Sequence, residues 1–361
     1  MKEKLKVGII GGTGMVGQQF ISLLHNHPWF RVTAIAASRR SAGKTYAAAV
    51  EGRWTRSGDI PANIASLVVE DAADIDRVSE QVDFVFCAVD LDKAATKKLE
   101  EDYARAETPV VSNNSAHRWT PDVPMVIPEI NPEHLAVIDA QRRRLGTKRG
   151  FIAVKPNCSI QSYVPALHPL LDYEPEQIVT CTYQAISGAG RTFASWPEMV
   201  DNVIPFIPGE EEKSEQEPLK VWGKVASGAI VSAAGPGITA QCIRVPVSDG
   251  HLAAVFVNFR TKPAKAEILA RWAAFRGKPQ EIALPSAPRQ FLKYMAEDSR
   301  PQTKLDRDYE NGMGVTIGRL REDSVYDYKF VCLSHNTLRG AAGGGVLTAE
   351  LLRAEGYLTA K

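Results

Sequence analysis

The sequence predicts an α/β protein of two domains, a doubly wound parallel sheet domain followed by an α+β domain with a mainly antiparallel sheet. Up to about residue 150, short apolar runs alternate with helical patterns, which is typical of parallel strands with helices on both faces. Longer β-rich runs follow, as in an antiparallel sheet. A length of 361 residues is sufficient for two domains.

The first part of the chain supplies the parallel sheet. The apolar strand Lys6–Ile10 leads into a glycine loop, Gly11–Gly17, after which apolar residues recur at helical spacing. The other elements expected here are the strands Val32–Ala37, Val82–Val89 and Val110–Ser112 and a charged helix over Asp92–Ala106. We therefore place a first domain over residues 1–155.

The second part has a different pattern. Long β-rich runs occupy Ile178–Ile186, Ile238–Val247 and Leu252–Phe259. Between them, Asp201–Lys224 is rich in Pro, Glu and Lys, which indicates a loop leading into a polar helix. An amphipathic helix over Val346–Gly356 closes the chain. We expect a second domain over residues 156–335 and a C-terminal segment, 336–361, that returns to the first domain.

Composition limits the possible partners and sites. The formal net charge is +1, so no global charge favours nucleic acid or a membrane surface. No apolar stretch approaches the roughly 20 residues of a membrane span, and the N-terminus does not resemble a signal peptide, so we expect a cytosolic protein. The five cysteines are scattered without CxxC spacing, so we expect neither a disulfide framework nor a metal site.

The glycine loop predicts a Rossmann-type dinucleotide site. Glycines permit a tight turn and close approach of the backbone to a pyrophosphate, and the start of the next helix offers unpaired N–H groups. The strand–loop–helix context favours this reading over a simple tight turn. The candidate cofactor contacts in the loop are Gly11, Thr13, Gly14, Met15, Val16 and Gly17.

The end of the second strand indicates which dinucleotide binds. An NAD site usually carries Asp or Glu there, about 20 residues after the loop. This chain instead has hydroxyl and guanidinium groups, which suit a 2′-phosphate. A solvated basic turn is the alternative, and we favour NADP (NADPH). The residues concerned are Ser38, Arg39, Arg40 and Ser41.

Cys158 is the candidate nucleophile. It follows a predicted strand, Phe151–Val154, and precedes a predicted helix. A helix N-terminus stabilises a thiolate, and its N–H groups could also stabilise an oxyanion. The other four cysteines lie in apolar strands, where we interpret them as small hydrophobic residues.

His251 is the candidate acid or base. It occupies a predicted turn between two long strands, with Arg244 on the preceding strand. The pattern alone leaves a purely structural turn histidine equally open. We expect His25 and His27, at the end of the first helix, to lie at the surface.

Eight segments together resemble aspartate-semialdehyde dehydrogenases. They occur in order across nearly the whole chain, and the length and Ser38–Lys44 resemble the archaeal and fungal branch more than the common bacterial one. The segments are Gly11–Gly17, Ser38–Lys44, Ser112–Arg118, Pro156–Ser159, Gln184–Gly190, Arg244–Val247, Gly250–His251 and Asn336–Gly344.

The resemblance implies specific roles. Cys158 would be the nucleophile and His251 the general acid/base, with Gln184 and Asn157 beside them. Arg244 would bind the substrate carboxylate, where arginine geometry is better than lysine. Further implied contacts are Glu217 for the substrate amine, Lys220 and Arg118 for phosphate, Asn114 for substrate, and Ser187, Gly188, Asn336 and Gly340 for NADP.

The implied reaction interconverts L-aspartate 4-semialdehyde, phosphate and NADP with L-4-aspartyl phosphate and NADPH through a cysteine thioester. It serves biosynthesis of lysine, threonine, methionine and isoleucine. The resemblance also implies a homodimer or homotetramer, with catalysis and dimerisation in the second domain and the sheet of that domain as the interface.

Three rival functions remain to be weighed. A malonyl-CoA reductase would use the same cysteine on a thioester without phosphate, and Asn157 with Glu217 favours the amino-acid substrate instead. A glutamyl-phosphate-type reductase fits the motifs less well. An inactive dinucleotide-binding regulator is disfavoured because the complete catalytic set is present. Departures from the family pattern that bear on the shape of the pocket are Gln161, Tyr163, Arg191 and Pro218.

Overall fold

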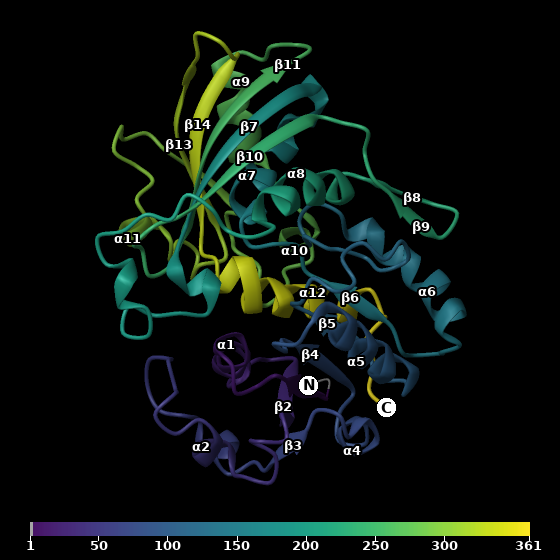
Figure 1. Ribbon diagram of the computed structural model, residues 1–361. Coiled ribbons are helices and arrows are strands. Elements are labelled where there is room, and N and C mark those ends of the chain that lie inside the picture. Colours follow the sequence, from purple (N-terminus) through teal and green to yellow (C-terminus); the bar gives the residue numbers. More distant parts are fainter. Residues whose placement is uncertain (1–2) are drawn as a thin grey trace.

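The computed structural model describes residues 3–361 and contains two six-stranded sheets, one in each half of the molecule (Figure 1). The first sheet has the order β3-β2-β1-β4-β5-β6, and all its strand pairs are parallel. This is the strand order of a doubly wound dinucleotide-binding sheet, as predicted. The strands are β1 (Leu5–Ile10), β2 (Phe30–Ala37), β3 (Val69–Asp71), β4 (Phe84–Cys87), β5 (Val110–Ser112) and β6 (Ile152–Val154).

Helices cover the first sheet where the sequence is amphipathic. α1 (Met15–Leu24) follows the glycine loop and packs on β1 and β2, burying Phe20, Ile21 and Leu24. α5 (Lys93–Arg105) begins at the cap Asp92 and packs on β5 and β6. The remaining helices of this region are α2 (Tyr46–Ala49), α3 (Ala62–Ala65), α4 (Ile75–Ser79), η1 (Pro132–Val137) and α6 (Ile138–Leu145).

The second sheet has the order β10-β7-β11-β14-β13-β12. Its three central pairs are antiparallel and its two outer pairs are parallel, so the expected, mainly antiparallel sheet is confirmed as a mixed one. The strands are β7 (Pro175–Gln184), β10 (Gly237–Arg244), β11 (His251–Phe259), β12 (Leu292–Met295), β13 (Val315–Glu322) and β14 (Tyr328–Ser334), and β8 (Lys224–Ala226) with β9 (Ala229–Val231) forms a separate hairpin.

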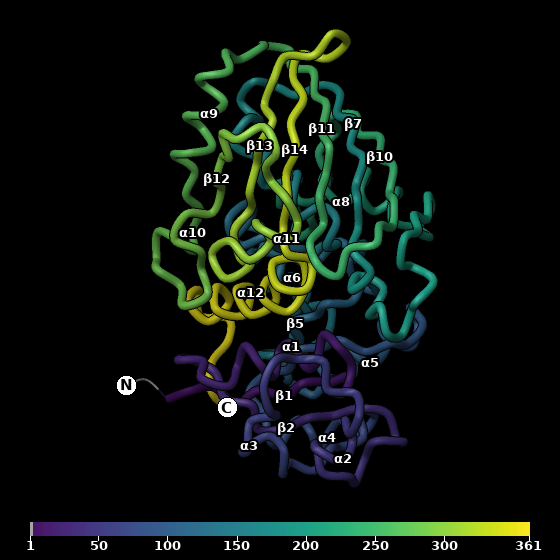
Figure 2. The backbone as a smooth tube through the Cα atoms, turned by 90° about the vertical axis from the view of Figure 1, so that its left-hand side faces the viewer, coloured from purple at the N-terminus to yellow at the C-terminus, as the bar shows by residue number. Residues whose placement is uncertain are grey.

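One face of the second sheet is covered by helices. α7 packs on β11, β13 and β14, α9 packs on β12, and α8 contacts β10. Along β11 the residues alternate between buried and half-buried, which shows that the opposite face is only partly covered. Figure 2 shows this sheet with α9 at one edge. The helices are α7 (Ile160–Leu167), η2 (His168–Tyr173), η3 (Ile186–Ala189), η4 (Pro197–Met199), α8 (Glu210–Val221), α9 (Lys265–Ala274), α10 (Lys278–Glu281) and α11 (Thr303–Asp306).

The C-terminal helix lies between the two sheets (Figure 1). α12 (Gly343–Ala354) follows η5 (Leu338–Ala342) and contacts both α1 and β5. A Cβ at Gly345 would lie 3.0 Å from the Phe20 ring, so glycine permits this close packing. Across residues 3–361, no helix is long and apolar enough to cross a membrane.

Two histidine expectations were wrong. His27 was expected at the surface, but it is buried, bonds Glu350 through Nε2 at 2.7 Å and stacks on Phe30. The C-terminal helix supplies this partner, and local sequence around His27 contains no sign of it. His251 was expected within a turn, but it is the first residue of β11 and fully buried.

Candidate active site

Cys158 and His251 come together from the two halves of the molecule, one following a strand of the first sheet and the other starting a strand of the second. Cys158 lies between the end of β6 and the start of α7, as the sequence predicted. Its Sγ lies 3.4 Å from Nε2 of His251 at the start of β11. The structure therefore pairs the one cysteine at a helix N-terminus with the histidine that the sequence singled out.

The partner of Nδ1 sets the proton position on His251. The backbone N–H of Ala185 donates to Nδ1 at 3.1 Å, so in the neutral ring the proton resides on Nε2. Burial, and next the nearby Arg244 guanidinium, lowers the pKa of His251 to about 3. The imidazole is thus neutral near neutral pH, and its Nε2–H points at the sulfur as a donor.

Charges of both signs surround the thiol. Burial raises the pKa of Cys158, and the Glu210 carboxylate adds to the rise. Lys155, Arg118 and Arg244 oppose it, because their positive charges favour the thiolate. One helix-start donor is already engaged, since the Ser159 N–H bonds Asn157 Oδ1 at 2.7 Å. An oxyanion there would need other donors.

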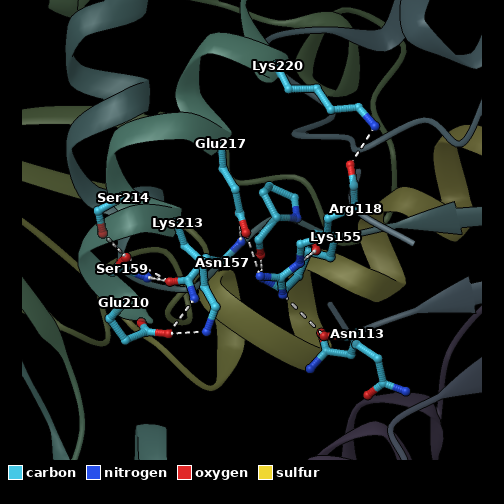
Figure 3. A network of polar contacts seen from close by, with 12 residues as sticks. Asn113, Arg118, Lys155, Asn157, Ser159, Glu210, Lys213, Ser214, Glu217 and Lys220 are labelled. Carbon is cyan, nitrogen blue, oxygen red and sulfur yellow. Dashed lines mark hydrogen bonds and ion pairs between the residues drawn. The ribbon is translucent and has the colours of Figure 1, made fainter. Parts of the chain in front are cut away.

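Two glutamates of α8 hold the residue before the nucleophile. Glu210 Oε1 accepts from Asn157 Nδ2 at 3.0 Å, and Glu217 Oε2 accepts from the Asn157 backbone N–H at 2.6 Å. Both side chains point from the helix toward Asn157, and Ser214 reaches Ser159 beside them (Figure 3). These residues share one helix face at spacings of three and four, which explains why a polar helix has a buried side.

A substrate-sized cavity opens next to the sulfur. It has a volume of about 400 Å³, and Cys158, Gln184, Glu210 and Arg244 all line it. Gln184 Nε2 donates to Glu210 Oε2 at 3.2 Å, while Arg244 Nη1 donates to the Ala185 carbonyl at 2.7 Å. The cavity thus offers a fixed cation, a fixed anion and a thiol.

A smaller cavity of about 130 Å³ lies on the other side of Cys158. Asn336 bridges its wall, accepting from the Gly250 N–H at 2.8 Å and donating to Ser187 Oγ at 2.9 Å. A Cβ at Gly340 would lie 2.8 Å from the Cys158 Cβ, so only glycine fits there without a shift. The lining residues include Asn113, Arg118, Lys155, Asn157, Ser187, Gly188, Asn336 and Gly340.

A groove of about 880 Å³ runs from the glycine loop toward these cavities, lined by Gly14, Met15, Val16, Asn114 and Arg191 among others. A pocket of about 260 Å³ follows at the end of β2, lined in part by Gly11, Thr13, Ser38 and Arg40.

Arg39 and Ser41 are the basic-turn residues outside that pocket. The Arg39 side chain is exposed and bonds Asp71 at 3.1 Å, and Ser41 is buried. At Gly17 a Cβ would lie 2.4 Å from the Gly11 carbonyl oxygen, so the loop and α1 pack as a dinucleotide fold requires.

The structure does not bring Glu217 and Lys220 to either cavity next to Cys158. Glu217 is fully buried and pairs with Arg118 Nη1 at 2.8 Å. Lys220 Nζ donates to the carbonyls of residues 118, 120 and 123 at 2.5, 3.1 and 3.2 Å. Both side chains therefore reach from α8 to Arg118 and hold that segment in place (Figure 3).

Sequence analysis missed Glu210 and Lys155. Helix α8 contains two Glu-x-x-Lys pairs, Glu210–Lys213 and Glu217–Lys220, and the first of them has its glutamate in the cavity. The helical spacing of Glu210, Ser214 and Glu217, which places them on one face of α8, is the signal that could have identified Glu210. Lys155 stands three residues before the nucleophile, and no spacing rule identifies it.

The unusual residues have defined places. Gln161 and Tyr163 are buried on α7, and the Tyr163 hydroxyl donates to the Ser214 carbonyl at 2.5 Å, so this bulk fixes α7 against α8. Pro218 lies inside α8 and is buried. Arg191 lines the large groove, where it can only affect the cofactor side.

Comparisons with known proteins agree with this geometry. Residues 6–138 match the family described as semialdehyde dehydrogenase, NAD binding domain, and residues 167–339 match its dimerisation domain. An aspartate-semialdehyde dehydrogenase from Archaeoglobus fulgidus is 42% identical over 97% of this chain and 98% of its own length. One from Schizosaccharomyces pombe is 42% identical over 98% and 99%.

A solved structure gives the same answer. The crystal structure of aspartate semialdehyde dehydrogenase with NADP from Candida albicans superposes with a TM-score of 0.88 at 36% identity, covering 98% of this chain and 100% of that one. The sequence-based resemblance to archaeal and fungal members is confirmed. The chain belongs to the aspartate-semialdehyde dehydrogenase family.

Proposed function

We propose that this chain catalyses the NADP-dependent, reversible conversion of L-aspartate 4-semialdehyde and phosphate into L-4-aspartyl phosphate. One observation carries the proposal: Arg244 and Glu210 line the same cavity as the Cys158 thiol. An amino-acid aldehyde carries a carboxylate, an ammonium and a carbonyl, and this cavity offers a partner for each. Arg244 is suited to the carboxylate and Glu210 to the ammonium.

Glu210 replaces Glu217 in this assignment. Burial raises the pKa of Glu210, but Lys213, at 2.8 Å, and the amides of Gln184 and Asn157 hold it below its ordinary value. The side chain is therefore a carboxylate near neutral pH, as an ammonium partner must be. Glu217 already compensates the charge of Arg118 and contacts neither cavity.

The groove fits an NADP molecule. The glycine loop, Asn114 and Arg191 line this groove together and form one continuous surface. Ser38 and Arg40 would face the 2′-phosphate, and Ser187, Gly188, Asn336 and Gly340 would face the nicotinamide end beside Cys158. When bound, NADP supplies the hydride acceptor of the oxidative direction.

The protein groups carry the remaining chemistry. The Cys158 sulfur adds to the aldehyde carbon, which forms a C–S bond while the S–H bond breaks, and the thiol proton passes to the aldehyde oxygen to give a thiohemiacetal. After oxidation of that carbon, a phosphate oxygen attacks the resulting thioester and the C–S bond breaks, which returns the thiolate. His251 donates through Nε2 to the sulfur and, in the reverse reaction, to the oxygen as it gains charge.

A spectrophotometric assay tests this function. NADPH formation with aspartate semialdehyde should require phosphate in the wild type and be lost, by about 10³-fold or more, in Cys158→Ala. NADPH oxidation with malonyl-CoA, in place of phosphate-dependent turnover, would move the chain to the acyl-CoA reductases. Activity with glutamyl phosphate alone, or cofactor binding without turnover, would support the other two rivals.

The assembly proposal concerns the second sheet. The chain has a dimerisation domain, consistent with a homo-oligomer. We propose a homodimer or homotetramer formed through the half-covered face of β7, β10 and β11, where Tyr183 is 36% exposed. Light scattering of wild type and Tyr183→Asp tests it, since a charge in an interface should favour monomers.

Two further predictions belong to the proposal. The domain divisions at residues 155/156 and 335/336 are supported by the end of β6 at Val154 and the end of β14 at Ser334, and limited proteolysis would test them. We retain a cytoplasmic location, which cell fractionation would test, and a role in biosynthesis of the aspartate-derived amino acids.

A further inference from the structure

Lys155 is a buried cation that the assignment above does not use. Its backbone N–H donates to the Ser112 carbonyl at 2.9 Å, which fixes the residue at the carboxyl end of β6. The side chain is only 3% exposed and lines the small cavity with Cys158 and Arg118. Its stem passes next to α12, since a Cβ at Gly344 would lie 3.2 Å from Lys155 Cδ.

The ammonium of Lys155 is poorly compensated. An ammonium has three donors, and within the described chain Lys155 Nζ bonds one acceptor, the carbonyl of Pro156. Among residues 3–361 no carboxylate lies within ion-pair distance of it. The neighbouring Glu217 is already engaged by Arg118 and the Asn157 N–H. A buried charge without a partner destabilises the fold, so a purely structural role is a poor explanation.

The surroundings favour an anion. Burial, and next the Arg118 guanidinium, lowers the pKa of Lys155 to about 7, and Arg339 lowers it further. Cys158 and Glu217 act in the opposite direction. A dianion entering the cavity would compensate the charge of Lys155 and could accept from the Arg118 donors that Glu217 leaves unused, which is what a phosphate site requires.

Lys220 provides the contrast. Its ammonium has three carbonyl partners and does not line the cavity. It was assigned to phosphate from a sequence motif, yet its donors are occupied. Lys155 has free donors and lines the small cavity together with Cys158 and Arg118.

We propose that Lys155 is a catalytic residue whose ammonium binds the phosphate group together with Arg118, beside the Cys158 sulfur. The inference rests on the proposed function and deepens it. In the oxidative direction the pair holds the phosphate that attacks the thioester. In the reverse direction it holds the phosphate that leaves when the thiolate attacks the acyl carbon.

Steady-state kinetics test the assignment. Lys155→Met should raise KM for phosphate about tenfold or more, with KM for aspartate semialdehyde changed less than about twofold. Its melting temperature should equal or exceed that of the wild type, because a buried charge is removed. Lys155→Arg should recover most of the phosphate affinity. Lys224→Met replaces an exposed lysine on β8 and is the matched control. It should change neither the KM for phosphate nor the melting temperature.

Calorimetry with inorganic phosphate provides a second readout. At about pH 8 phosphate is mostly a dianion and Lys155 mostly neutral, so binding should take up a proton in the wild type and none in Lys155→Met or Lys155→Arg. An unchanged KM for phosphate in Lys155→Met would overturn the assignment. A lower melting temperature together with a rise in KM for both phosphate and aspartate semialdehyde would overturn it as well. Absence of phosphate-dependent turnover in the wild type would instead refute the proposed function. In that case the proton uptake on phosphate binding would still test the role of Lys155.

Discussion

The two Glu-x-x-Lys pairs of α8 have the same spacing and opposite surroundings. Glu210 lies at the cavity with its partner Lys213 half-buried at the surface. Glu217 and Lys220 are both buried, and each has a partner in the segment that begins at Arg118. About two turns of helix separate the proposed substrate contact, Glu210, from the support, Glu217.

The comparison shows why a motif does not determine a role. Both glutamates accept from Asn157. Glu210 accepts from the Asn157 side-chain amide, and Glu217 accepts from the Asn157 backbone N–H. They differ in what the second carboxylate oxygen contacts. For Glu210 it is the Gln184 amide at the cavity wall, and for Glu217 the buried Arg118 guanidinium. The neighbouring groups therefore favour the proposed substrate role for Glu210 and a stabilising role for Glu217.

Replacement of Glu217 should have the largest effect on stability. Glu217→Gln removes the counter-charge of Arg118, and we expect the free energy of unfolding to fall by about 3–5 kcal/mol, as for other broken buried ion pairs. Urea denaturation measures the change. Glu212→Gln, exposed on the same helix, is the control and should stay within about 0.5 kcal/mol of the wild type. Equal losses of stability in Glu217→Gln and Glu212→Gln would show that the buried ion pair of Glu217 does not stabilise the fold.

Glu210→Gln should lose activity with little loss of stability. We expect kcat/KM for aspartate semialdehyde to fall about 100-fold, because the substrate ammonium loses a charged partner. The same change removes a charge that raises the pKa of Cys158. Alkylation of the thiol by iodoacetamide near neutral pH should therefore be faster in the variant. Slower alkylation, or a drop in stability like that of Glu217→Gln, would make Glu210 a support as well.

Sequence reasoning reached much of the fold and the centre of the site. Apolar runs located most strands of both sheets, although β3, β12 and β13 were not predicted. The position of Cys158 between a strand and a helix identified it without its partner. It could not choose between the two glutamates of α8, because that choice depends on contacts with residues 118, 157 and 184. Lys155 was missed for the same reason, since its burial results from Arg118 and α12 packing over it.

The buried lysine of the supporting pair should make stability depend on pH. Burial lowers the pKa of Lys220 from 10.5 to about 8, so between these values the unfolded chain binds more protons than the folded one. Stability should then rise with pH over this range, by at most about 1.4 kcal/mol per pH unit. Lys220→Met should reduce this rise to the part that Lys155 contributes over the same range, and should lose about 2 kcal/mol at neutral pH through unpaired carbonyls. If the free energy of unfolding has the same pH dependence in the wild type and in Lys220→Met, burial of the charged Lys220 does not destabilise the fold.

The lysine of the cavity pair should contribute least to stability. Lys213 bonds Glu210 at 2.8 Å, but its side chain is 28% exposed, and partly solvated pairs of this kind contribute under about 1 kcal/mol. Lys213→Met should therefore change the free energy of unfolding by less than that, and added salt should reduce the difference further. Glu210 keeps its bonds to Asn157 and Gln184, which hold the carboxylate in place without the lysine. A loss as large as that of Lys220→Met would mean that both lysines are supports, and the contrast between the pairs would then rest on the glutamates alone.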